Sequence, residues 1–326
     1  MRAITKCIDA GTKYCPCKLA EIGQCIVCSQ CGGKQSCSCS NWNGACIYQE
    51  FLNNKMKAKS MRGSYRCKVS TVIPFDDVMF VRAEVPYELE LELVSPGSFV
   101  FARINENPFF DTPISVLFTE FSTGTIGLAV ITKGVKTIPF QALKGGDFLF
   151  LRGPYFNGIF GQHDLQRQMN GNALVLARGI GFLPSLSVIA ALHHQHNETK
   201  IFLDWSNFNV KLLAFFNDFF ELKSERLTLL GPSGMTAEAK EMIRNTLEEN
   251  INFIHIGGSD FLVCQVVNFL KECRYTDIRL SCCNNAKLCC GEGICGACTQ
   301  NDSAQIVRRL CKEQIDPYHM AERNPQ

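Results

Sequence analysis

The cysteines near the C-terminal end constrain this chain more than any other feature of its sequence. Cys290, Cys295, Cys298 and Cys311 follow the spacing C-x4-C-x2-C-x12-C. Three of the four lie on one short loop, so their thiolates and that of the distant Cys311 can converge on a compact cationic centre. We therefore expect residues 276–326 to form a loop domain organised around a metal centre.

Glycines fill this loop, and each one removes a Cβ atom from the neighbourhood of the sulfurs. Gly291, Gly293 and Gly296 allow positive φ angles, which other residues avoid. They also let backbone N–H groups turn toward bridging sulfides. The glycines therefore indicate a loop whose backbone closely follows a bound group.

The cysteine spacing favours a [2Fe–2S] cluster over zinc. Plant-type [2Fe–2S] proteins use C-x4-C-x2-C with a distant fourth cysteine. Zinc usually prefers paired C-x2-4-C hooks, and only one hook is short here. A structural zinc site or a group of reduced thiols is the alternative. Cys282, Cys283 and Cys289 are surplus, and each is most simply a buried thiol, with ligand exchange or a second cluster as other interpretations.

The number and placement of the cysteines also bear on the cellular setting. The chain has 326 residues and 19 cysteines, most of them in the first 67 residues or between residues 282 and 311. Disulfide frameworks are typical of small secreted domains, whereas this chain is large and begins without an apolar leader. We expect metal ligation in the cytoplasm. A net charge of +2 favours neither nucleic acid nor a membrane surface, and no apolar run reaches the ~18 residues of a membrane span.

Residues 1–62 form a cysteine-rich head with too few aliphatic residues for a core of its own. We expect metal ligands to hold it together. Cys25, Cys28 and Cys31 follow C-x2-C-x2-C, the start of a bacterial iron–sulfur motif, although no Cys-Pro follows at the usual interval. Zinc is an equal alternative, and redox-active thiols are a third. The polar, basic residues 53–60 indicate a linker.

Residues 63–165 carry the signals of a small antiparallel β-barrel. Short apolar segments recur between turn signals such as Pro96-Gly97 and Gly153-Pro154. The strictest apolar/polar alternation spans residues 87–93, and it predicts a half-buried strand.

Residues 166–275 alternate between apolar strands and helical stretches, which indicates an α/β nucleotide-binding domain. The run 172–177 is typical of a buried parallel strand. It leads into the turn 179–184, and further strands end at Asp204 and at Gly257-Gly258. Since ligands of such sheets bind beyond the carboxyl ends of the strands, we expect these segments on one rim.

The motifs of these three units together resemble one family. The matching segments are residues 96–100, 113–115, 133–137, 153–158 and 179–184, followed by the C-terminal cysteines. They are similar to those of the electron-transfer subunit of two-component dihydroorotate dehydrogenase, within the ferredoxin–NADP reductase superfamily. The resemblance covers about residues 63–315 and gives the head no counterpart.

The resemblance implies three cofactors: FAD between barrel and nucleotide domain, NAD(P)H, and the [2Fe–2S] cluster. It implies flavin contacts at Pro113, Ile114, Ser115, Lys133, Gly134 and Thr137. It implies nicotinamide-nucleotide contacts at Gly179, Gly181, Pro184, Gly257 and Gly258.

The chain departs from the family pattern at three of these motifs. Thr112 stands where members usually have Arg, Arg178 lies in a turn that commonly starts Gly-Gly-Gly, and Ile256 replaces the Cys of a late Cys-Gly-Pro motif. Each change bears on cofactor binding and leaves the fold expectation intact. Asp204, at a strand end, favours NAD over NADP.

We therefore expect an electron-transfer subunit that moves electrons from NAD(P)H through FAD and the [2Fe–2S] cluster to a partner oxidoreductase or other redox protein. The cofactors carry this chemistry, so no catalytic His or carboxylate is nominated. One alternative is a non-enzymatic electron-transfer or scaffold subunit that has lost nicotinamide binding. Another is a zinc-stapled interaction protein whose cysteines are structural.

Overall fold

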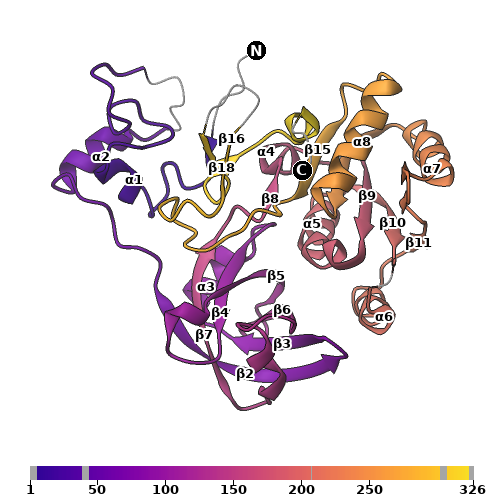
Figure 1. The fold of residues 1–326 in the computed structure, drawn as a ribbon, viewed down its shortest axis with the longest axis horizontal. Coiled ribbons are helices and arrows are strands. Elements are labelled where there is room, and N and C mark those ends of the chain that lie inside the picture. Colours follow the sequence, from indigo (N-terminus) through magenta and orange to yellow (C-terminus); the bar gives the residue numbers. More distant parts are fainter. Residues whose placement is uncertain (1–5, 39–43, 207, 302–306, 323–326) are drawn as a thin grey trace.

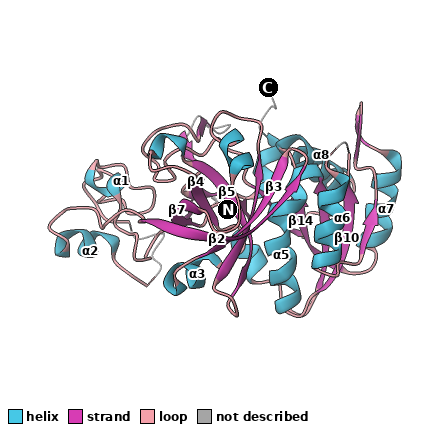
Figure 2. Cartoon of the chain, turned by 90° about the horizontal axis from the view of Figure 1, so that it is seen from below, coloured by secondary structure: helices cyan, strands magenta, loops and turns pink. Residues whose placement is uncertain are grey.

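The computed structural model describes residues 6–38, 44–206, 208–301 and 307–322. Figure 1 shows a cysteine-rich head, a barrel and an α/β unit, with the C-terminal segment running between the head and the α/β unit. In the second view the head helices and the α/β unit again lie on opposite sides of the barrel (Figure 2). No helix in the described parts is long and apolar enough to cross a membrane.

Six antiparallel strands form a closed barrel in the order β2-β3-β6-β5-β4-β7. They are β2 (Ser64–Phe75), β3 (Val78–Glu84), β4 (Phe99–Arg103), β5 (Thr112–Glu120), β6 (Thr125–Ile131) and β7 (Phe148–Tyr155). Alternate aliphatic side chains of these strands fill the interior, among them Val69, Val81 and Leu128, which have no exposed surface. The expected antiparallel barrel is confirmed.

The strand predicted over residues 87–93 is wrong, because this segment is helix α3 (Tyr87–Leu93). Leu89 and Leu93 lie four residues apart, which puts both on one helical face, and both are buried in the barrel core. Leu91, which the alternation would bury with them, is 49% exposed. Leu and Glu are strong helix formers and Glu is depleted in strands, so intrinsic propensity outweighed the alternation.

The α/β unit is built on a six-stranded sheet in the order β11-β10-β9-β14-β15-β8. Its strands are β8 (Ile159–Phe160), β9 (Asn172–Arg178), β10 (Glu198–Asp204), β11 (Ser224–Arg226), β14 (Ile251–Gly257) and β15 (Arg279–Cys283). All pairs are parallel except β15 with β8. The chain leaves β9 toward β10 on one side and returns to β14 on the other. This reversal makes the carboxyl ends of β9 and β14 a topological switch point, where ligands of open α/β sheets bind.

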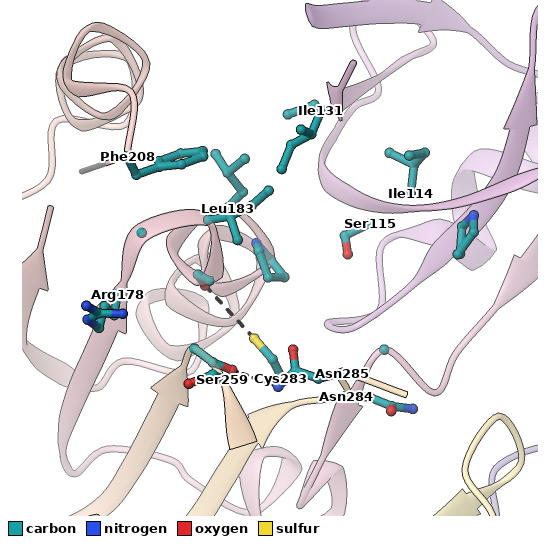
Figure 3. A pocket seen from close by; sticks show the side chains of 18 of the residues that line it. Ile114, Ser115, Ile131, Arg178, Leu183, Phe208, Ser259, Cys283, Asn284 and Asn285 are labelled. Atoms are coloured by element: carbon teal, nitrogen blue, oxygen red, sulfur yellow. Dashed lines mark hydrogen bonds between the residues drawn. The ribbon is translucent and has the colours of Figure 1, made fainter. Parts of the chain in front are cut away.

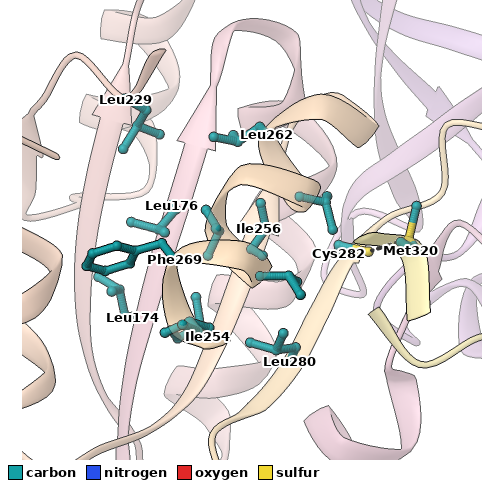
Figure 4. Packing of buried hydrophobic residues seen from close by; sticks show 14 of the residues in the cluster. Leu174, Leu176, Leu229, Ile254, Ile256, Leu262, Phe269, Leu280, Cys282 and Met320 are labelled. Atoms are coloured by element: carbon teal, nitrogen blue, oxygen red, sulfur yellow. Dashed lines mark hydrogen bonds between the residues drawn. The ribbon is translucent and has the colours of Figure 1, made fainter. Parts of the chain in front are cut away.

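Helices cover both faces of this sheet. They are α4 (Gln162–Gln166), α5 (Phe182–His194), α6 (Val210–Phe219), α7 (Ala237–Leu247) and α8 (Asp260–Glu272). Leu174 and Leu176 of β9 share a core with side chains of α7 and α8, of which Leu262 and Phe269 of α8 are seen in Figure 4. Val175 packs in a core with residues of α5 and α6. The expected α/β unit is confirmed. The hairpin β12 (Leu230–Gly231) with β13 (Gly234–Met235) precedes α7.

The sheet crosses both domain boundaries expected from the sequence. Strand β8 lies within the segment 63–165 assigned to the barrel, and β15 lies within the segment 276–326 assigned to the cluster. Cys282 and Cys283 are on β15 and are buried, as simple buried thiols would be, while Cys289 is exposed. Strand β15 pairs with β14 on one side and with β8 on the other, so the segment that leads to the cysteine loop starts from within the α/β sheet.

The head is held to the C-terminal segment by strand pairing. Its elements are β1 (Lys6–Cys7), α1 (Lys18–Glu21) and α2 (Ile47–Asn53), and the C-terminal ones are β16 (Thr299–Asn301), β17 (Val307–Arg309), β18 (Glu313–Gln314) and the 3-10 helix Pro317–Glu322. Strand β1 pairs with β18. A small core in the head contains Ala20, Cys31, Ile47 and Phe51. The head and the C-terminal end of the chain thus form one packed unit.

Candidate functional site

A cleft of about 670 Å³ lies between the barrel and the α/β unit, within the size range of small-molecule sites. The barrel side contributes Thr112, Pro113, Ile114, Ser115, Leu117, Ala129, Ile131 and Thr137. The α/β side contributes residues 178–181, Leu183, Pro184, Ser206, Phe208, Gly258, Ser259 and 283–285. In Figure 3, Ile114, Ser115 and Ile131 of the barrel lie across the cleft from Leu183 and Cys283.

The barrel wall of the cleft combines apolar side chains with a polar turn. Ile114 and Ser115 lie on β5, beside β4. Thr137 closes the turn after β6, because Gly134 N donates to Thr137 Oγ1 at 3.1 Å. Lys133 of the same turn does not line the cleft and pairs with Asp77 instead. Of the expected flavin contacts, the structure therefore brings Pro113, Ile114, Ser115 and Thr137 to the cleft, whereas Lys133 and Gly134 do not line it.

The α/β wall presents the amino end of a helix. Gly179 has φ +54°, a conformation that suits glycine, and it starts the 3-10 turn Gly179–Gly181 that leads into α5. The N-cap of α5 is Gly181, whose missing side chain provides no cap hydrogen bond. The first-turn N–H groups of α5 therefore have no capping acceptor in a side chain, and such a helix end attracts anions. Pro184 fits this first turn because its missing N–H would be unpaired there.

The glycines at the ends of β9 and β14 allow two backbones to touch. A Cβ atom on Gly181 would lie 2.3 Å from the carbonyl oxygen of Gly257. One on Gly257 would lie 2.0 Å from Ser185 Oγ. Gly257 does not line the cleft, whereas Gly258 does. Close packing between these turns thus accounts for glycine here.

A buried hydrogen-bonded row supports the glycine turn from below. Ser185 Oγ donates to the carbonyl of Gly181 at 2.7 Å and lies 3.0 Å from His255 Nε2, while His255 Nδ1 lies 2.7 Å from Ser281 Oγ. Burial lowers the pKa of His255 to about 3, so the imidazole is neutral near neutral pH. The row joins α5, β14 and β15 at the floor of the cleft and fixes the position of the turn.

Asp204 does not present a free carboxylate to a ribose, contrary to the role expected from its place at a strand end. It is 5% exposed. Arg178 Nε lies 3.0 Å from Asp204 Oδ2, and the same carboxylate accepts from the N–H groups of Leu229 and Ser206, each at 2.9 Å. The carboxylate therefore holds Arg178 and the turn after β10 in place.

Asp111, which directly precedes β5, neutralises two arginines of the neighbouring strands β4 and β7. Arg103 Nη1 lies 2.6 Å from Asp111 Oδ1, and Arg152 Nε lies 2.7 Å from Asp111 Oδ2. Asp111 directly precedes Thr112, which stands where the resemblance implies Arg. Among the described residues that line the cleft, Arg178 is the one Lys or Arg side chain.

Sequence reasoning missed several lining residues of the cleft. The Cβ atom of Phe208 lies 3.6 Å from the position that a Cβ on Gly179 would take. Asn285 Nδ2 donates to the carbonyl of Gly258 at 2.8 Å, which ties the segment after β15 to the rim. Cys283 Sγ approaches the carbonyl of Gly181 (Figure 3). Asn284 and Asn285 directly follow strand β15 and so lie at the same rim as the glycine turns. This position in the sequence was the signal that could have identified them.

The cysteine loop has the backbone that its glycines predicted. Gly291, Gly293 and Gly296 have φ of +72°, +74° and +76°. Backbone N–H groups point at sulfur: Glu292 N donates to Cys290 Sγ at 3.3 Å, and Gly293 N donates to Cys311 Sγ at 3.2 Å. Hydrogen bonds of this kind stabilise a thiolate, so the loop is suited to sulfur in its ligand form.

The four thiols of this loop lie together. The Cys311 thiol is the hydrogen-bonding partner of those of Cys290 and Cys298, and Cys290 is also the partner of Cys295. The hydrogen bond from the Cys311 thiol is the main cause that lowers the pKa of Cys290; burial opposes it, and backbone N–H donors add to it. The hydrogen bonds to Cys290 and Cys298 raise the pKa of Cys311. Across the described residues, no group of three or more His, Cys, Asp and Glu is arranged to hold a metal ion. Four cysteine thiolates are the ligand set of a [2Fe–2S] cluster, so the donors of this loop suit such a cluster.

Hydrogen bonds join the cleft to the cysteine loop. Asn284, which lines the cleft, donates from Nδ2 to the carbonyl of Leu310 at 2.8 Å, directly before Cys311. Asn157 Nδ2 donates to the same carbonyl at 2.7 Å. On the barrel side, Arg152 Nη1 donates to the carbonyl of Cys290 at 3.1 Å. The floor of the cleft and the loop are therefore separated by single side chains.

Comparison with known proteins agrees with this architecture. No protein-family model matches the chain. A probable electron transfer subunit of dihydroorotate dehydrogenase B (NAD(+)) from Methanothermobacter thermautotrophicus is 28% identical over 230 residues, which cover 68% of this chain and 76% of the relative. A protein with the same description from Pyrococcus horikoshii is 24% identical over 208 residues, or 63% of this chain and 73% of the relative.

One solved structure shows the same fold. It is an NADH-dependent reduced ferredoxin–NADP oxidoreductase studied for flavin-based electron bifurcation. It superposes with a TM-score of 0.55 at 19% identity, and covers 78% of this chain and 87% of that one. The likeness to dihydroorotate dehydrogenase electron-transfer subunits and to ferredoxin–NADP reductase-type domains, expected from the sequence, is thus confirmed.

Proposed function

We propose that this chain is an electron-transfer subunit that passes electrons from NAD(P)H through FAD and a [2Fe–2S] cluster to a partner oxidoreductase. The observation that carries the proposal is the shared cleft. Segments 112–115 and 178–184, more than sixty residues apart in sequence, form its opposite walls, and Asn284 of its lining bonds the loop with four cysteines. The two archaeal relatives, each described as a probable electron transfer subunit, support the same assignment.

In this proposal the barrel wall holds the flavin. Ile114, Leu117 and Ile131 offer apolar surface to a ring system, while Ser115, Thr112 and Thr137 offer hydroxyl groups to its polar edge and phosphates. A mostly apolar pocket with a few polar groups is typical of a cofactor site. Bound FAD supplies the step between two-electron and one-electron chemistry, and the protein excludes water around it.

The nicotinamide nucleotide docks at the amino end of α5. The N–H groups after Gly179–Gly181 and the partly exposed guanidinium of Arg178 face the same side of the cleft. Both favour a pyrophosphate. With Asp204 engaged by Arg178, either NADH or NADPH fits this proposal.

The four cysteines of the C-terminal loop hold the iron–sulfur centre. When bound, it carries single electrons. The protein contributes the positive-φ glycines, the N–H groups directed at Cys290 and Cys311, and the Asn284 contact that keeps loop and cleft together. Cys295 is exposed, so a partner can approach the loop closely. The alternatives without nicotinamide binding or with purely structural cysteines are not favoured, because neither requires such a cleft.

Anaerobic titration with NADH and with NADPH tests the proposal. The purified chain is expected to carry flavin that bleaches with at least one nucleotide, followed by loss of visible cluster absorbance. The variant Ser115→Val removes one hydroxyl from the flavin wall and is expected to weaken FAD binding by up to about tenfold. Ser122→Val, on an exposed turn of the same barrel, is the matched control and should bind FAD normally. Folded protein that binds no flavin and shows no bleaching would refute the proposal.

A further inference from the structure

Four cysteines of the head, Cys15, Cys25, Cys28 and Cys31, have no role in the proposed function, yet they lie together. Cys31 is 3% exposed at the centre of the small head core, and Cys15, Cys25 and Cys28 pack against that core. Nine residues lie between Cys15 and Cys25, so the chain has folded back to bring them together. A segment this poor in aliphatic residues gains little from burying thiols for their own sake.

The backbone around these cysteines is wound tightly. Cys28 N donates to Cys25 Sγ at 3.4 Å, Cys25 N to the carbonyl of Cys31 at 3.2 Å, and Gly32 N to the carbonyl of Cys28 at 2.8 Å. A Cβ atom on Gly32 would lie between 3.0 and 3.3 Å from the carbonyl oxygens of Cys25, Cys28 and Ser29. Glycine thus permits a turn that encloses three cysteines and directs an N–H group at sulfur, as the C-terminal loop does.

The fourth cysteine comes from earlier in the chain. In two-cluster ferredoxins the Cys-Pro that ends a C-x2-C-x2-C-x3-C-P run ligates the other cluster, so the fourth ligand of each cluster is a Cys-Pro cysteine from a distant part of the chain. The only Cys-Pro pair of this sequence is Cys15-Pro16. Cys15 and Cys25 both line a small cavity inside the head. Ligation depends on position in space and not on order in the chain. Cys15, which packs against the same head core as Cys25 and Cys28, therefore completes the set.

We propose that Cys15, Cys25, Cys28 and Cys31 hold a second iron–sulfur cluster, of the [4Fe–4S] type. Zinc sites are usually built from two C-x2-4-C hooks, and Cys15-Pro16-Cys17 is too short to form one. The three equally spaced cysteines together with a Cys-Pro favour iron. Cys17, beside the same cavity, is outside the proposed ligand set.

The two cysteine groups are neighbours. Leu19, which is 1% exposed, lines the head cavity together with Cys15 and Cys25. Its Cδ1 atom lies 3.0 Å from the position that a Cβ on Gly293 would take, and Gly293 lies between Cys290 and Cys295. One leucine side chain therefore spans the distance between the wall of the head site and the C-terminal loop.

A closed ring of buried charges keeps the head in this position. Asp9 and Arg62 of the head alternate with Glu292 and Lys312 of the C-terminal segment. Arg62 bonds Asp9 at 2.6 Å and Glu292 at 3.1 Å, and Lys312 bonds Asp9 at 2.5 Å and Glu292 at 2.8 Å. The ring is neutral overall, with every side chain at most 9% exposed. Such a ring favours a fixed docking geometry, because any separation would leave unpaired buried charges.

This placement gives the head site a function that rests on the proposed function of the chain. One electron would pass from the reduced centre of the C-terminal loop, which becomes oxidised, to the head cluster, which becomes reduced. No bond is made or broken and no proton is needed. The head would then offer the partner a second electron outlet.

Metal analysis of the full-length chain, purified without oxygen, tests the site. The wild type is expected to contain about six irons, two in one cluster and four in the other, with about as many labile sulfides. The double variant Cys25→Ser/Cys28→Ser is expected to retain about two irons, and Cys295→Ser/Cys298→Ser about four. Paramagnetic resonance of reduced wild type should show two cluster signals, and each double variant should lose a different one.

A matched control lies in the same head. Cys46 is exposed and caps helix α2, where its sulfur accepts from Gln49 N, and serine is a good residue at such a position. Cys46→Ser should therefore leave about six irons. An equal iron count in Cys25→Ser/Cys28→Ser and wild type would overturn the proposal, as would zinc in place of iron in the head. Persistence of the two-iron signal in that variant shows that the chain has folded. Loss of flavin bleaching with head iron intact would instead refute the proposed function alone.

Discussion

Replacing Gly291 by alanine should damage the cysteine loop much more than the same change at Gly296. Both glycines have nearly the same positive φ, +72° and +76°. They differ in what a new methyl group would meet. At Gly291 it would lie 2.3 Å from Cε1 of Tyr155, and at Gly296 the nearest atom is Thr299 Oγ1 at 3.9 Å. The pair therefore separates backbone strain from steric overlap within one loop.

The expected magnitudes follow from these two terms. A non-glycine residue in the left-handed region costs about 1–2 kcal/mol, which is the whole cost expected for Gly296→Ala. Gly291→Ala adds the cost of displacing a packed ring, about 1–3 kcal/mol. Tyr155 cannot move away easily, because it is 2% exposed and stacks on Phe99 with ring centroids 5.2 Å apart. The additional term corresponds to about 5–150-fold faster opening of the loop.

Release of iron to a chelator, followed anaerobically, measures that opening without requiring reversible unfolding of the whole chain. Gly291→Ala should lose the C-terminal iron faster than Gly296→Ala by the factor above. The double variant Gly291→Ala/Tyr155→Leu should recover part of the difference, since the smaller side chain leaves room for the methyl group. Equal release rates for the two alanine variants would refute the assignment of glycine 291 to close packing against the ring.

Three further predictions test the charges of the molecule. Lys312→Met leaves the buried carboxylates of Asp9 and Glu292 with Arg62 as their one cation and should weaken the docking of the head by about 3–5 kcal/mol. The second substitution Asp9→Asn should restore part of that docking free energy, as measured by hydrogen exchange in β1. Burial lowers the pKa of His255 from 6.5 to about 3. The contribution of the neutral His255 to the free energy of unfolding is therefore full above pH 6.5 and falls as the pH drops toward 3, by up to about 1.4 kcal/mol per pH unit. Melting curves of His255→Asn should lack this part of the acid dependence. Arg178→Gln should raise the KM for the nicotinamide nucleotide about tenfold and leave the iron content unchanged.

Local patterns were sufficient for much of the fold and for half of the site. The buried run at 172–177 and the turn at Gly179 predicted the strand and helix that frame the cleft, because periodicity and glycine placement are local properties. The cysteine loop was also predictable, and its three glycines have the positive φ expected of them. Residues 87–93 were misjudged because alternation was given more weight than the helix propensity of Leu and Glu. That conflict is visible in the sequence and could have been resolved there.

The roles of charged residues were the part that sequence could not supply. Asp204 stands at a strand end, as a ribose-binding carboxylate would, yet its oxygens are engaged by Arg178 and by backbone N–H groups. Asp111 likewise neutralises Arg103 and Arg152 instead of leaving them to a cofactor. Whether a carboxylate is available to a ligand depends on the donors around it in space, and a one-dimensional pattern does not contain them.

The docking of the head follows the same logic over a longer distance. Asp9, Arg62, Glu292 and Lys312 each look like ordinary surface charges in the sequence, and nothing marks them as partners. Folding buries all four in one ring. Burial alone would lower the pKa of Lys312, but the nearby carboxylates of Asp9 and Glu292 outweigh this effect and raise the pKa of Lys312. Because Glu292 lies between two cysteines of the C-terminal loop and Asp9 lies beside those of the head, the ring ties both cysteine groups to one rigid geometry. The ring thus keeps the two cysteine groups close together, which is the geometry that the proposed electron transfer between them requires.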